Sequence, residues 1–203
     1  MEQRFDKLTD AELLQRYIKG DEAAFREIVN RYKNSLYAFL RQFLNRMDLV
    51  EDVFQETFLQ LFASRKSFDP NRPLRPWLFT IAANKAKDAL RRMQRSEVTQ
   101  LGNMFDSDES TIDDVLNALD HDEHMPYDDL IRNERAASVK RVISRMPAKL
   151  REIIVLAYFH KFAYAEIAQI LSIPIGTVKS RLHTAVGRFA EDWEACSLYE
   201  MAN

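Results

Sequence analysis

The sequence predicts an all-α protein made of two small helical domains joined by a flexible acidic linker. Apolar residues recur at helical spacing in both halves, and no stretch alternates between apolar and polar residues as a strand would. The charge changes sign twice: residues 1–96 carry 18 Lys and Arg against 13 Asp and Glu, residues 97–134 carry 1 against 12, and residues 135–203 carry 10 against 6. We expect a helical domain over 1–96, an acidic, largely disordered linker over 97–134 and a C-terminal helix–turn–helix domain over 135–203.

The N-terminal domain is predicted to contain four helices. Thr9 and Glu12 match a capping box that starts the first helix, and Gly20 is placed to end it. A long apolar stripe predicts a second helix that ends near Leu44. Three prolines predict a loop over 68–76 between the third and fourth helices.

The third and fourth helices each have a set of expected core residues. For the third helix, which begins near residue 48, these are Leu49, Val53, Phe58, Leu61 and Phe62. For the fourth helix they are Trp77, Leu78, Ile81, Ala82, Ala89 and Met93. The linker that follows contains one helically spaced group, residues 112–119, which could form a short helix that docks elsewhere.

Three helical segments are predicted in the C-terminal domain after Pro147, which closes a helix of its own. Apolar residues from 150 to Tyr158 share one helical face, a polar break follows at His160 and Lys161, and a shorter helix runs over 164–171. Pro174 stops that helix but fits the first turn of the next one. The last helix is expected to bury Val178, Leu182, Ala185 and Phe189.

The outer face of that last helix is polar and basic. It consists of Ser180, His183, Thr184 and Gly187, flanked by Lys179, Arg181 and Arg188. A short helix, a tight turn and a helix with such a face form the arrangement that places a helix in the major groove of DNA. The alternative is a plain three-helix core with a solvated face.

A second basic region lies between residues 65 and 95. It has nine Lys and Arg against two Asp, beside the proline-rich loop and Trp77. Such a strip suits the backbone of DNA, including single-stranded DNA whose bases can stack on aromatic rings. A solvated helix face is the alternative interpretation.

Composition argues against several other classes. No apolar run approaches the ~20 residues of a membrane span, and Met1 to Asp10 lacks a signal-peptide core, so we expect a cytoplasmic protein. Cys196 is the single cysteine, which excludes an internal disulfide. The group His121 to His124 could bind a metal, but a solvated charge run is the favoured interpretation. We find no convergent catalytic groups, and expect no enzyme activity and no cofactor.

Six motifs, taken in order, resemble those of extracytoplasmic-function (ECF) sigma factors, which are promoter-recognition subunits of bacterial RNA polymerase. The first half contains GDEAAF at 20–25, EDVFQETF at 51–58 and RPWLFTIA at 75–82. The second half contains MP at 146–147, YAEIA at 164–168 and IPIGTVKSRLH at 173–183. The resemblance covers most of residues 9–96 and 135–190. One departure is Lys161, which stands where a glycine is common and leaves the geometry of that turn open.

The resemblance implies a partner for each surface. The third helix would bind the clamp helices of the largest subunit of core RNA polymerase through Asp52, Gln55, Glu56 and Leu59. The loop and fourth helix would recognise and open the minus-ten element through Asn71, Arg72, Trp77, Asn84, Lys85, Lys87, Arg91 and Arg92. The last helix would read the minus-thirty-five element through Thr177, Lys179, Ser180, Arg181, His183, Thr184 and Arg188. Promoter DNA and core polymerase are thus the expected partners, and an anti-sigma factor is a further one that the resemblance allows.

Three other functions stay open on the sequence alone. A free-standing repressor or activator would use the same helix–turn–helix, usually as a dimer on paired half-sites. An enzyme with an appended DNA-binding domain would need a catalytic site, which the sequence does not reveal. An interaction protein could keep the fold of a sigma factor without its transcription activity.

Overall fold

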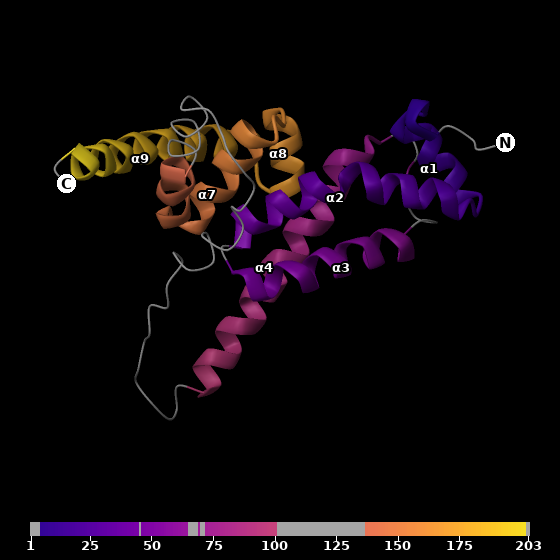
Figure 1. Ribbon diagram of the computed structural model, residues 1–203, viewed down its shortest axis with the longest axis horizontal. Helices are drawn as coiled ribbons and strands as arrows, with labels where there is room; N and C mark the ends of the chain where they lie inside the picture. The colour runs from indigo at the N-terminus through magenta and orange to yellow at the C-terminus, as the bar shows by residue number, and fades with distance from the viewer. Residues whose placement is uncertain (1–4, 45, 65–68, 70–71, 101–136, 202–203) are drawn as a thin grey trace, which may run out of the picture.

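The described residues of the computed structural model, 5–44, 46–64, 69, 72–100 and 137–201, form helices and short connections without a strand. None of these helices is long and apolar enough to cross a bilayer. The helix α1 and the long C-terminal helix α9 lie at opposite ends of an elongated molecule (Figure 1). The predicted all-α fold is confirmed.

The first two helices begin and end where local chemistry predicts. In front of α1 (Asp10–Ile18), the Thr9 hydroxyl accepts from the Glu12 amide while the Glu12 carboxylate accepts from the Thr9 amide, which is a complete capping box. Gly20 ends this helix at φ +97°, a conformation that glycine adopts without steric cost. The Asp21 carboxylate then accepts from the first amides of α2 (Glu22–Leu44).

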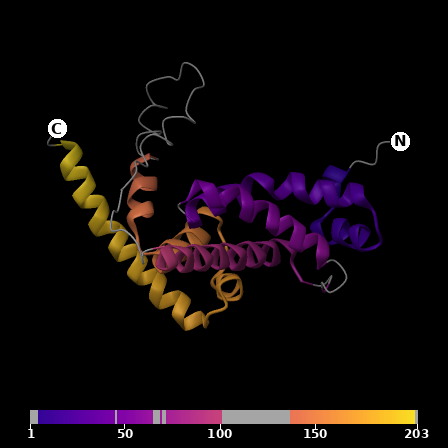
Figure 2. The ribbon, with the colours of Figure 1, turned by 90° about the horizontal axis from the view of Figure 1, so that it is seen from below.

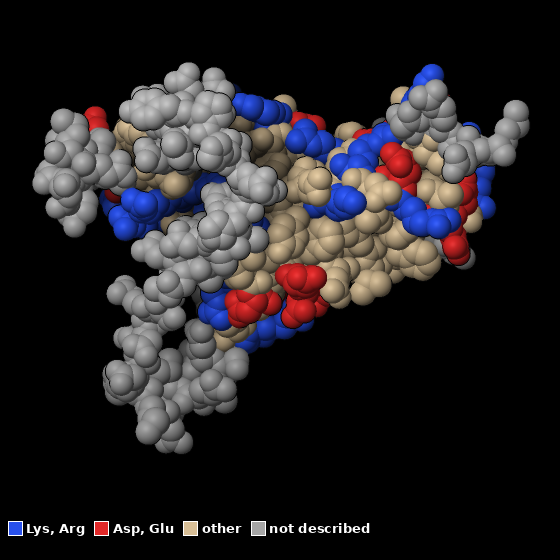
Figure 3. Space-filling view, in the orientation of Figure 1, with Lys and Arg blue, Asp and Glu red and all other residues tan. Residues whose placement is uncertain are grey.

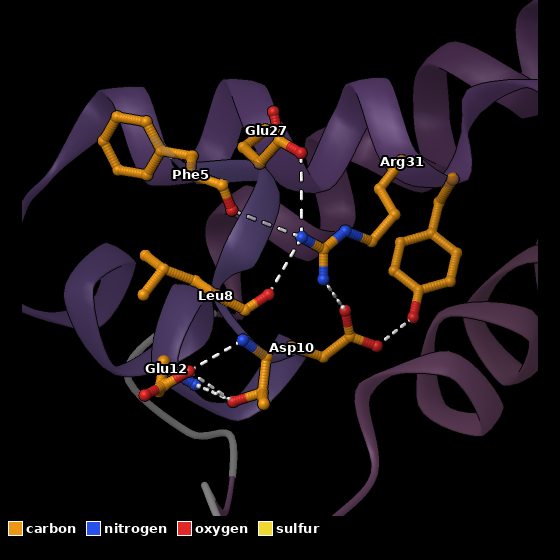
Figure 4. Close-up of polar contacts among 8 residues, drawn as sticks. Phe5, Leu8, Asp10, Glu12, Glu27 and Arg31 are labelled. Carbon is orange, nitrogen blue, oxygen red and sulfur yellow. Dashed lines mark hydrogen bonds and ion pairs between the residues drawn. The ribbon is translucent and has the colours of Figure 1, made fainter. Parts of the chain in front are cut away.

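A polar cluster fixes the N-terminal segment on α2. The Arg31 guanidinium donates to the Asp10 carboxylate at 2.7 Å and to the Leu8 carbonyl at 3.0 Å, while the Tyr32 hydroxyl donates to the other Asp10 oxygen (Figure 4). Burial and the adjacent carboxylate raise the pKa of Tyr32 well above its usual range, so its hydroxyl stays protonated as the donor. This cluster therefore joins α1 to α2 by charge-assisted hydrogen bonds.

The helices α3 (Met47–Ala63) and α4 (Leu74–Gln100) complete the N-terminal half. The predicted loop over 68–76 is too long, because α4 already begins at Leu74 and accepts Pro76 in its first turn. The prediction that Phe62 is buried is also wrong, since 46% of its surface is exposed. Its neighbour Leu61 fills the core position of that turn instead.

The C-terminal half contains a helix over residues 137–145, then α7 (Ala148–Ile154), η2 (Val155–Phe159), α8 (Tyr164–Leu171) and α9 (Ile175–Met201). The segment η2 is a π-helical turn that continues α7, and this wider turn changes which side chains face inward. Tyr158, which was expected on the apolar face of this segment, is about half exposed, and so is Tyr164 at the start of α8.

The two halves pack against each other. Helix α8 lies beside α4 (Figure 2), and α7 and η2 lie against α2. One face of α4 is buried that the sequence pattern did not assign to a core. It contains Phe79, Ala83 and Ala86, which are fully buried. The predicted short helix at 112–119 and most of the acidic linker lie outside the described residues.

Candidate DNA-binding and protein-binding surfaces

The helix α9 presents the polar face that the sequence predicts. The Pro174 carbonyl accepts the amides of Thr177 and Val178 at 2.9 and 3.1 Å, so the helix starts directly after the proline. The stripe of Val178, Leu182 and Ala185 is buried. On the opposite side lie four exposed residues, which are Lys179, Ser180, His183 and Thr184. These side chains are available to a base edge or a phosphate.

The residues at the borders of this face have partners in the protein. Thr177 is half-buried, and its carbonyl accepts the Ser180 hydroxyl at 3.2 Å. Arg181 lies 3.7 Å from the Glu152 carboxylate. Arg188 is exposed and pairs along its own helix with Asp192 at 3.1 Å. The two arginines at the edges of this face, Arg181 and Arg188, are thus each paired with a carboxylate of the protein.

Four of the predicted DNA-contacting residues of the loop and α4 are exposed. Arg72 at the approach to the helix and Asn84, Arg91 and Arg92 along it all face solvent, while Lys85 is half-buried. Asn71 lies outside the described residues. Trp77 differs from its neighbours because its indole is half-buried and packs against the hydrophobic core. Part of its ring surface therefore stabilises the first turn of α4.

The outer face of α3 combines acidic and apolar residues. Asp52 and Gln55 are exposed, and Leu59 exposes 68% of its surface. Acidic side chains gather over the first turns of α3, and an uncharged surface continues along the helix (Figure 3). Exposed Phe62 extends that apolar surface, and its exposure was not predicted because its spacing also fits the core stripe.

Glu56 has a role within the protein that its sequence position did not reveal. Its carboxylate lies 3.5 Å from the Lys85 ammonium and 3.4 Å from the Arg92 guanidinium, both on α4. A residue predicted to bind polymerase is therefore paired with two residues predicted to bind DNA. Ion pairs that remain this accessible to solvent add little stability.

Lys87 is directed toward the C-terminal half. Its ammonium donates to the Leu171 carbonyl at 3.3 Å and lies 3.9 Å from the Glu152 carboxylate. Glu152 is buried, and burial raises its pKa although Lys87 and Arg181 pull in the opposite direction. The structure thus brings one residue from each predicted DNA-contacting helix to the same carboxylate.

An aromatic cluster also lies in the contact between the two halves, which we call the junction. The His160 imidazole packs between the rings of Phe39 and Phe79, with ring centroids 5.6 and 5.1 Å away. Phe162 contacts Phe79 at 4.9 Å and lies under the Arg75 guanidinium at 4.3 Å. Burial lowers the pKa of His160 to about 4, so the ring is neutral near pH 7.

Sequence reasoning missed this junction. Arg151, Glu152 and His160 are buried, although each stands next to an apolar stripe, where polar residues are normally solvated. Their burial arises from a second domain, and a helical pattern records only the burial of its own face. The sequence pattern places His160 only in a polar break between two helices. No signal within one chain segment could have indicated its partner.

Comparisons with known proteins agree with this architecture. Residues 28–96 match the family model described as Sigma-70 region 2, and residues 136–188 match that described as Sigma-70, region 4. The chain is similar to the ECF RNA polymerase sigma factor SigW of Bacillus subtilis, with 33% identity over 170 residues that cover 81% of this chain and 86% of SigW. It is also similar to the ECF RNA polymerase sigma-E factor of Haemophilus influenzae, with 31% identity covering 89% and 93% of the two chains.

Two solved structures resemble the whole fold. One is CnrH in complex with the cytosolic domain of CnrY, with a TM-score of 0.63 and 25% identity, covering 92% of this chain and 97% of that one. The other is the sigma factor RpoE in complex with the anti-sigma factor NepR from Bartonella quintana, with a TM-score of 0.66 and 26% identity, covering 84% and 96%. With regions 2 and 4 both matched and relatives aligned over most of their length, the chain belongs to the ECF sigma factors, which direct transcription initiation.

Proposed function

We propose that this sigma factor binds core RNA polymerase through α3 and selects promoters by reading the minus-thirty-five element with α9 and the minus-ten element with α4. The observation that carries the proposal is the two-sided character of α9. One side is buried in the core through Val178, Leu182 and Ala185. The other side exposes Lys179, Ser180, His183 and Thr184 to solvent. A helix–turn–helix with that division contacts base edges with its exposed polar side chains.

The exposed side chains of α9 divide into two groups by chemistry. His183, Ser180 and Thr184 carry the hydrogen-bonding groups suited to base edges. Lys179 carries a flexible positive charge suited to a phosphate. Contacts to bases specify sequence, whereas contacts to phosphates position the protein and supply salt-dependent affinity.

The surface of α4 suits a different form of DNA. Arg72, Arg91 and Arg92 provide exposed positive charge along the helix, and the Asn84 amide can both donate and accept. Positive charge that follows the backbone is typical of proteins that bind single strands. This supports recognition and opening of the minus-ten element by α4.

The surface of α3 suits a protein partner. Leu59 and Phe62 are large, apolar and exposed, and Asp52 and Gln55 lie beside them. An apolar centre with a polar rim is the usual composition of a protein–protein interface. We assign this surface to the clamp helices of the largest polymerase subunit. Binding of polymerase and of promoter DNA places the protein in the cytoplasm.

An anti-sigma factor is a further partner supported by the relatives. Two solved structures of similar fold are complexes, one of CnrH with the cytosolic domain of CnrY and one of RpoE with the anti-sigma factor NepR. A partner of this kind would cover the exposed apolar side chains of this chain, among which are Leu59, Phe62 and Tyr158.

The test is in vitro transcription with purified core polymerase and a library of genomic DNA fragments. We expect transcripts whose start sites share two upstream elements. His183→Ala should relax the preference at one base of the upstream element, at a cost of ~1–3 kcal/mol there. The matched variant Lys179→Ala should lower output from all promoters about equally and flatten the salt dependence.

Two outcomes would contradict the proposal, and a third would revise the orientation of α9 on DNA. An absence of promoter-directed transcripts from the wild-type factor would show that it keeps the fold without the activity. Tight binding of paired half-sites by a dimer of the isolated protein would favour a free-standing regulator instead. A uniform loss for His183→Ala, with unchanged preference, would show that α9 enters the groove with a different rotation.

A further inference from the structure

A surface outside the three proposed binding faces concentrates positive charge. Residues 137–151 contain five Lys and Arg and no Asp or Glu. Three of these cations, Lys140, Arg141 and Arg145, are exposed on the helix over residues 137–145, which is the first helix of the C-terminal half. We call these three side chains the basic surface. None of the six sequence motifs includes them.

The helix that carries the basic surface has two distinct faces. Val142 and Ile143 are buried, and Ile143 belongs to the same hydrophobic core as Val178 of α9. With 3.6 residues per turn, the three cations of the basic surface lie within an arc of about 140° on the other side. The inner face therefore fixes the basic surface to the domain that carries α9.

The charge on this helix is unfavourable for the protein by itself. Arg141 and Arg145 are four residues apart, so their like charges are neighbours on adjacent turns and destabilise the helix. Within the described residues, no carboxylate pairs with Lys140 or Arg145, whereas Arg181 and Arg188 each have such a partner. The arrangement becomes favourable when an external anion neutralises it.

The composition of the basic surface favours nucleic acid over protein as that anion. Among the described residues, no large apolar side chain is exposed on the helix over 137–145. A protein interface usually has an apolar centre, as the outer face of α3 has in Leu59 and Phe62. Interfaces with DNA are more polar and much more positively charged. Lys and Arg without apolar neighbours therefore suit a phosphate backbone.

The position of the basic surface indicates which part of the DNA it contacts. The reading residues of α9, 179 to 184, extend about 9 Å along the helix, whereas one turn of duplex is about 34 Å long. Most of that turn is therefore left to other parts of the domain. The helix over 137–145 packs on the core behind the reading face of α9, so it can reach the backbone only beyond the stretch that α9 covers.

We propose that the basic surface is a second DNA-binding site of the C-terminal half, which binds phosphates of the duplex flanking the minus-thirty-five element without regard to sequence. The inference rests on the proposed reading of that element by α9. Contacts to phosphates position a protein and supply salt-dependent affinity, whereas contacts to bases specify sequence. The basic surface therefore strengthens binding to all promoters, while His183 and its neighbours on α9 select among them.

The test compares holoenzymes, assembled from core polymerase and the full chain, on a promoter duplex recovered by the transcription assay. The triple variant Lys140→Gln, Arg141→Gln, Arg145→Gln removes three exposed charges and should melt no lower than wild type, since like charges are separated. Each phosphate contact contributes about 0.9 to the slope of log affinity against log salt, so we expect the slope to fall by roughly 2 to 3.

Hydroxyl-radical footprinting locates the lost contacts. In the triple variant, protection of the backbone should disappear outside the minus-thirty-five element and persist within it. The preference for bases, scored on a randomised promoter library, should not change, because phosphate contacts carry no sequence information. A variant that merely disturbed the fold of the domain would lose protection within the element as well.

Two matched variants separate a direct contact from the effect of net charge. Lys19→Gln, Arg26→Gln, Lys33→Gln removes the same charge from exposed positions of the N-terminal half and should lower the slope by less than about 1. Arg141→Lys, Arg145→Lys keeps the charge of the basic surface. It should retain the wild-type slope and footprint, because a lysine ammonium also binds a phosphate as a point charge.

Every result bears on the assignment of the basic surface. An unchanged slope or footprint in its triple Gln variant overturns the proposal, and so does an equal fall in the slope of the two triple variants. Weaker binding of the variant to core polymerase would identify a protein partner instead. A loss of affinity for single-stranded RNA, with unchanged affinity for duplex DNA, would identify RNA.

Failure of the proposed function can be told apart from failure of this inference. If the wild-type factor and core polymerase yield no promoter-directed transcripts, the proposed function fails. The salt dependence of binding is then measured for the free full chain on a duplex of random sequence. The same fall in slope for the triple Gln variant of the basic surface supports a DNA-binding site there, and an unchanged slope overturns it.

Discussion

The two helices proposed to read DNA differ in how freely they present their surfaces. Along α9, Lys179, His183 and Thr184 face solvent directly above a buried apolar stripe. Along α4, Phe79 is fully buried and Lys87 donates to the opposite half. Both helices belong to one molecule and have similar length, so the difference arises from what packs on their outer sides.

The difference shows that the solvent exposure of a helix in a two-domain protein depends on whether the two domains are in contact. α9 packs against α7 and α8, which belong to its own domain, and leaves its other face open. α4 buries one face within its own domain and a second against α8. We therefore expect α4, but not α9, to change its accessibility when the halves separate.

The largest expected effect comes from Phe79→Ala. This ring is fully buried between Phe39, His160 and Phe162, so its removal should lower the free energy of unfolding by about 3–5 kcal/mol. It should also reduce hydrogen-exchange protection of the α8 amides. Leu61→Ala is the control, because it empties a core position on α3. Loss of α8 protection in both variants would show that α8 reports global stability only.

The junction also predicts a pH dependence. An unfolded histidine has a pKa near 6.5, whereas burial lowers that of His160 to about 4 in the folded protein. Between these values the unfolded chain binds more protons, so stability should fall as pH falls from 6.5 to about 4, by up to about 3 kcal/mol. Of its neighbours, Arg75 disfavours the protonated ring, and the rings of Phe39 and Phe79 offer it no counter-charge.

Urea melts across that pH range measure this dependence, with His160→Gln as the comparison. Glu152 acts in the opposite direction, because its raised pKa lets the folded protein take up a proton first as pH falls. The slope that His160→Gln removes is therefore the contribution of the imidazole alone. An equally steep slope in His160→Gln would assign the pH dependence to other groups.

Binding of core polymerase should be independent of the junction, since α3 lies on an open face as α9 does. Asp52→Lys reverses an exposed charge on that face and should weaken binding to core polymerase at least about tenfold, or 1.4 kcal/mol. Melting behaviour should not change. Glu22→Lys makes the same charge change on α2 and should bind normally. Equal affinity of Asp52→Lys and wild type, measured by fluorescence anisotropy, would remove α3 from the interface.

The smallest effect concerns the turn that carries His160 and Phe162 into the junction. Lys161 has φ +56°, a left-handed conformation that disfavours a residue with a Cβ atom. Lys161→Gly should remove this strain and stabilise the protein by about 0.5 kcal/mol, the gain being limited by the greater freedom of glycine in the unfolded chain. Lys161→Ala keeps the strain, and thermal melting should show no gain for it. A gain of equal size in both variants would point to the lysine side chain rather than to the backbone.

The sequence predicted much of the helical framework and of the open surfaces. The capping box at Thr9 and the stop at Gly20 placed α1, and Pro174 placed the start of α9, because caps and breakers act within a few residues of themselves. The exposed face of α9 followed from its buried stripe, since a helix has a fixed period. Asp52 and Gln55 were placed on the outside of α3 by the same argument, whereas Leu59 was assigned to that face only by the resemblance.

Tertiary structure alone decided the junction. The π-helical turn at 155–159 left Tyr158 exposed, and the packing of α8 on α4 buried Phe79 and drew Lys87 away from solvent. These outcomes depend on residues far apart in the chain: Arg75 and His160 are 85 positions apart, and Lys87 and Leu171 are 84 positions apart. Periodicity and capping report neighbours within one or two turns, so the sequence by itself determined each helix and its inner face. Only the tertiary structure decided which outer faces meet. That choice depends on the hydration of buried charges, on ring packing and on the helix-end carbonyls of both domains.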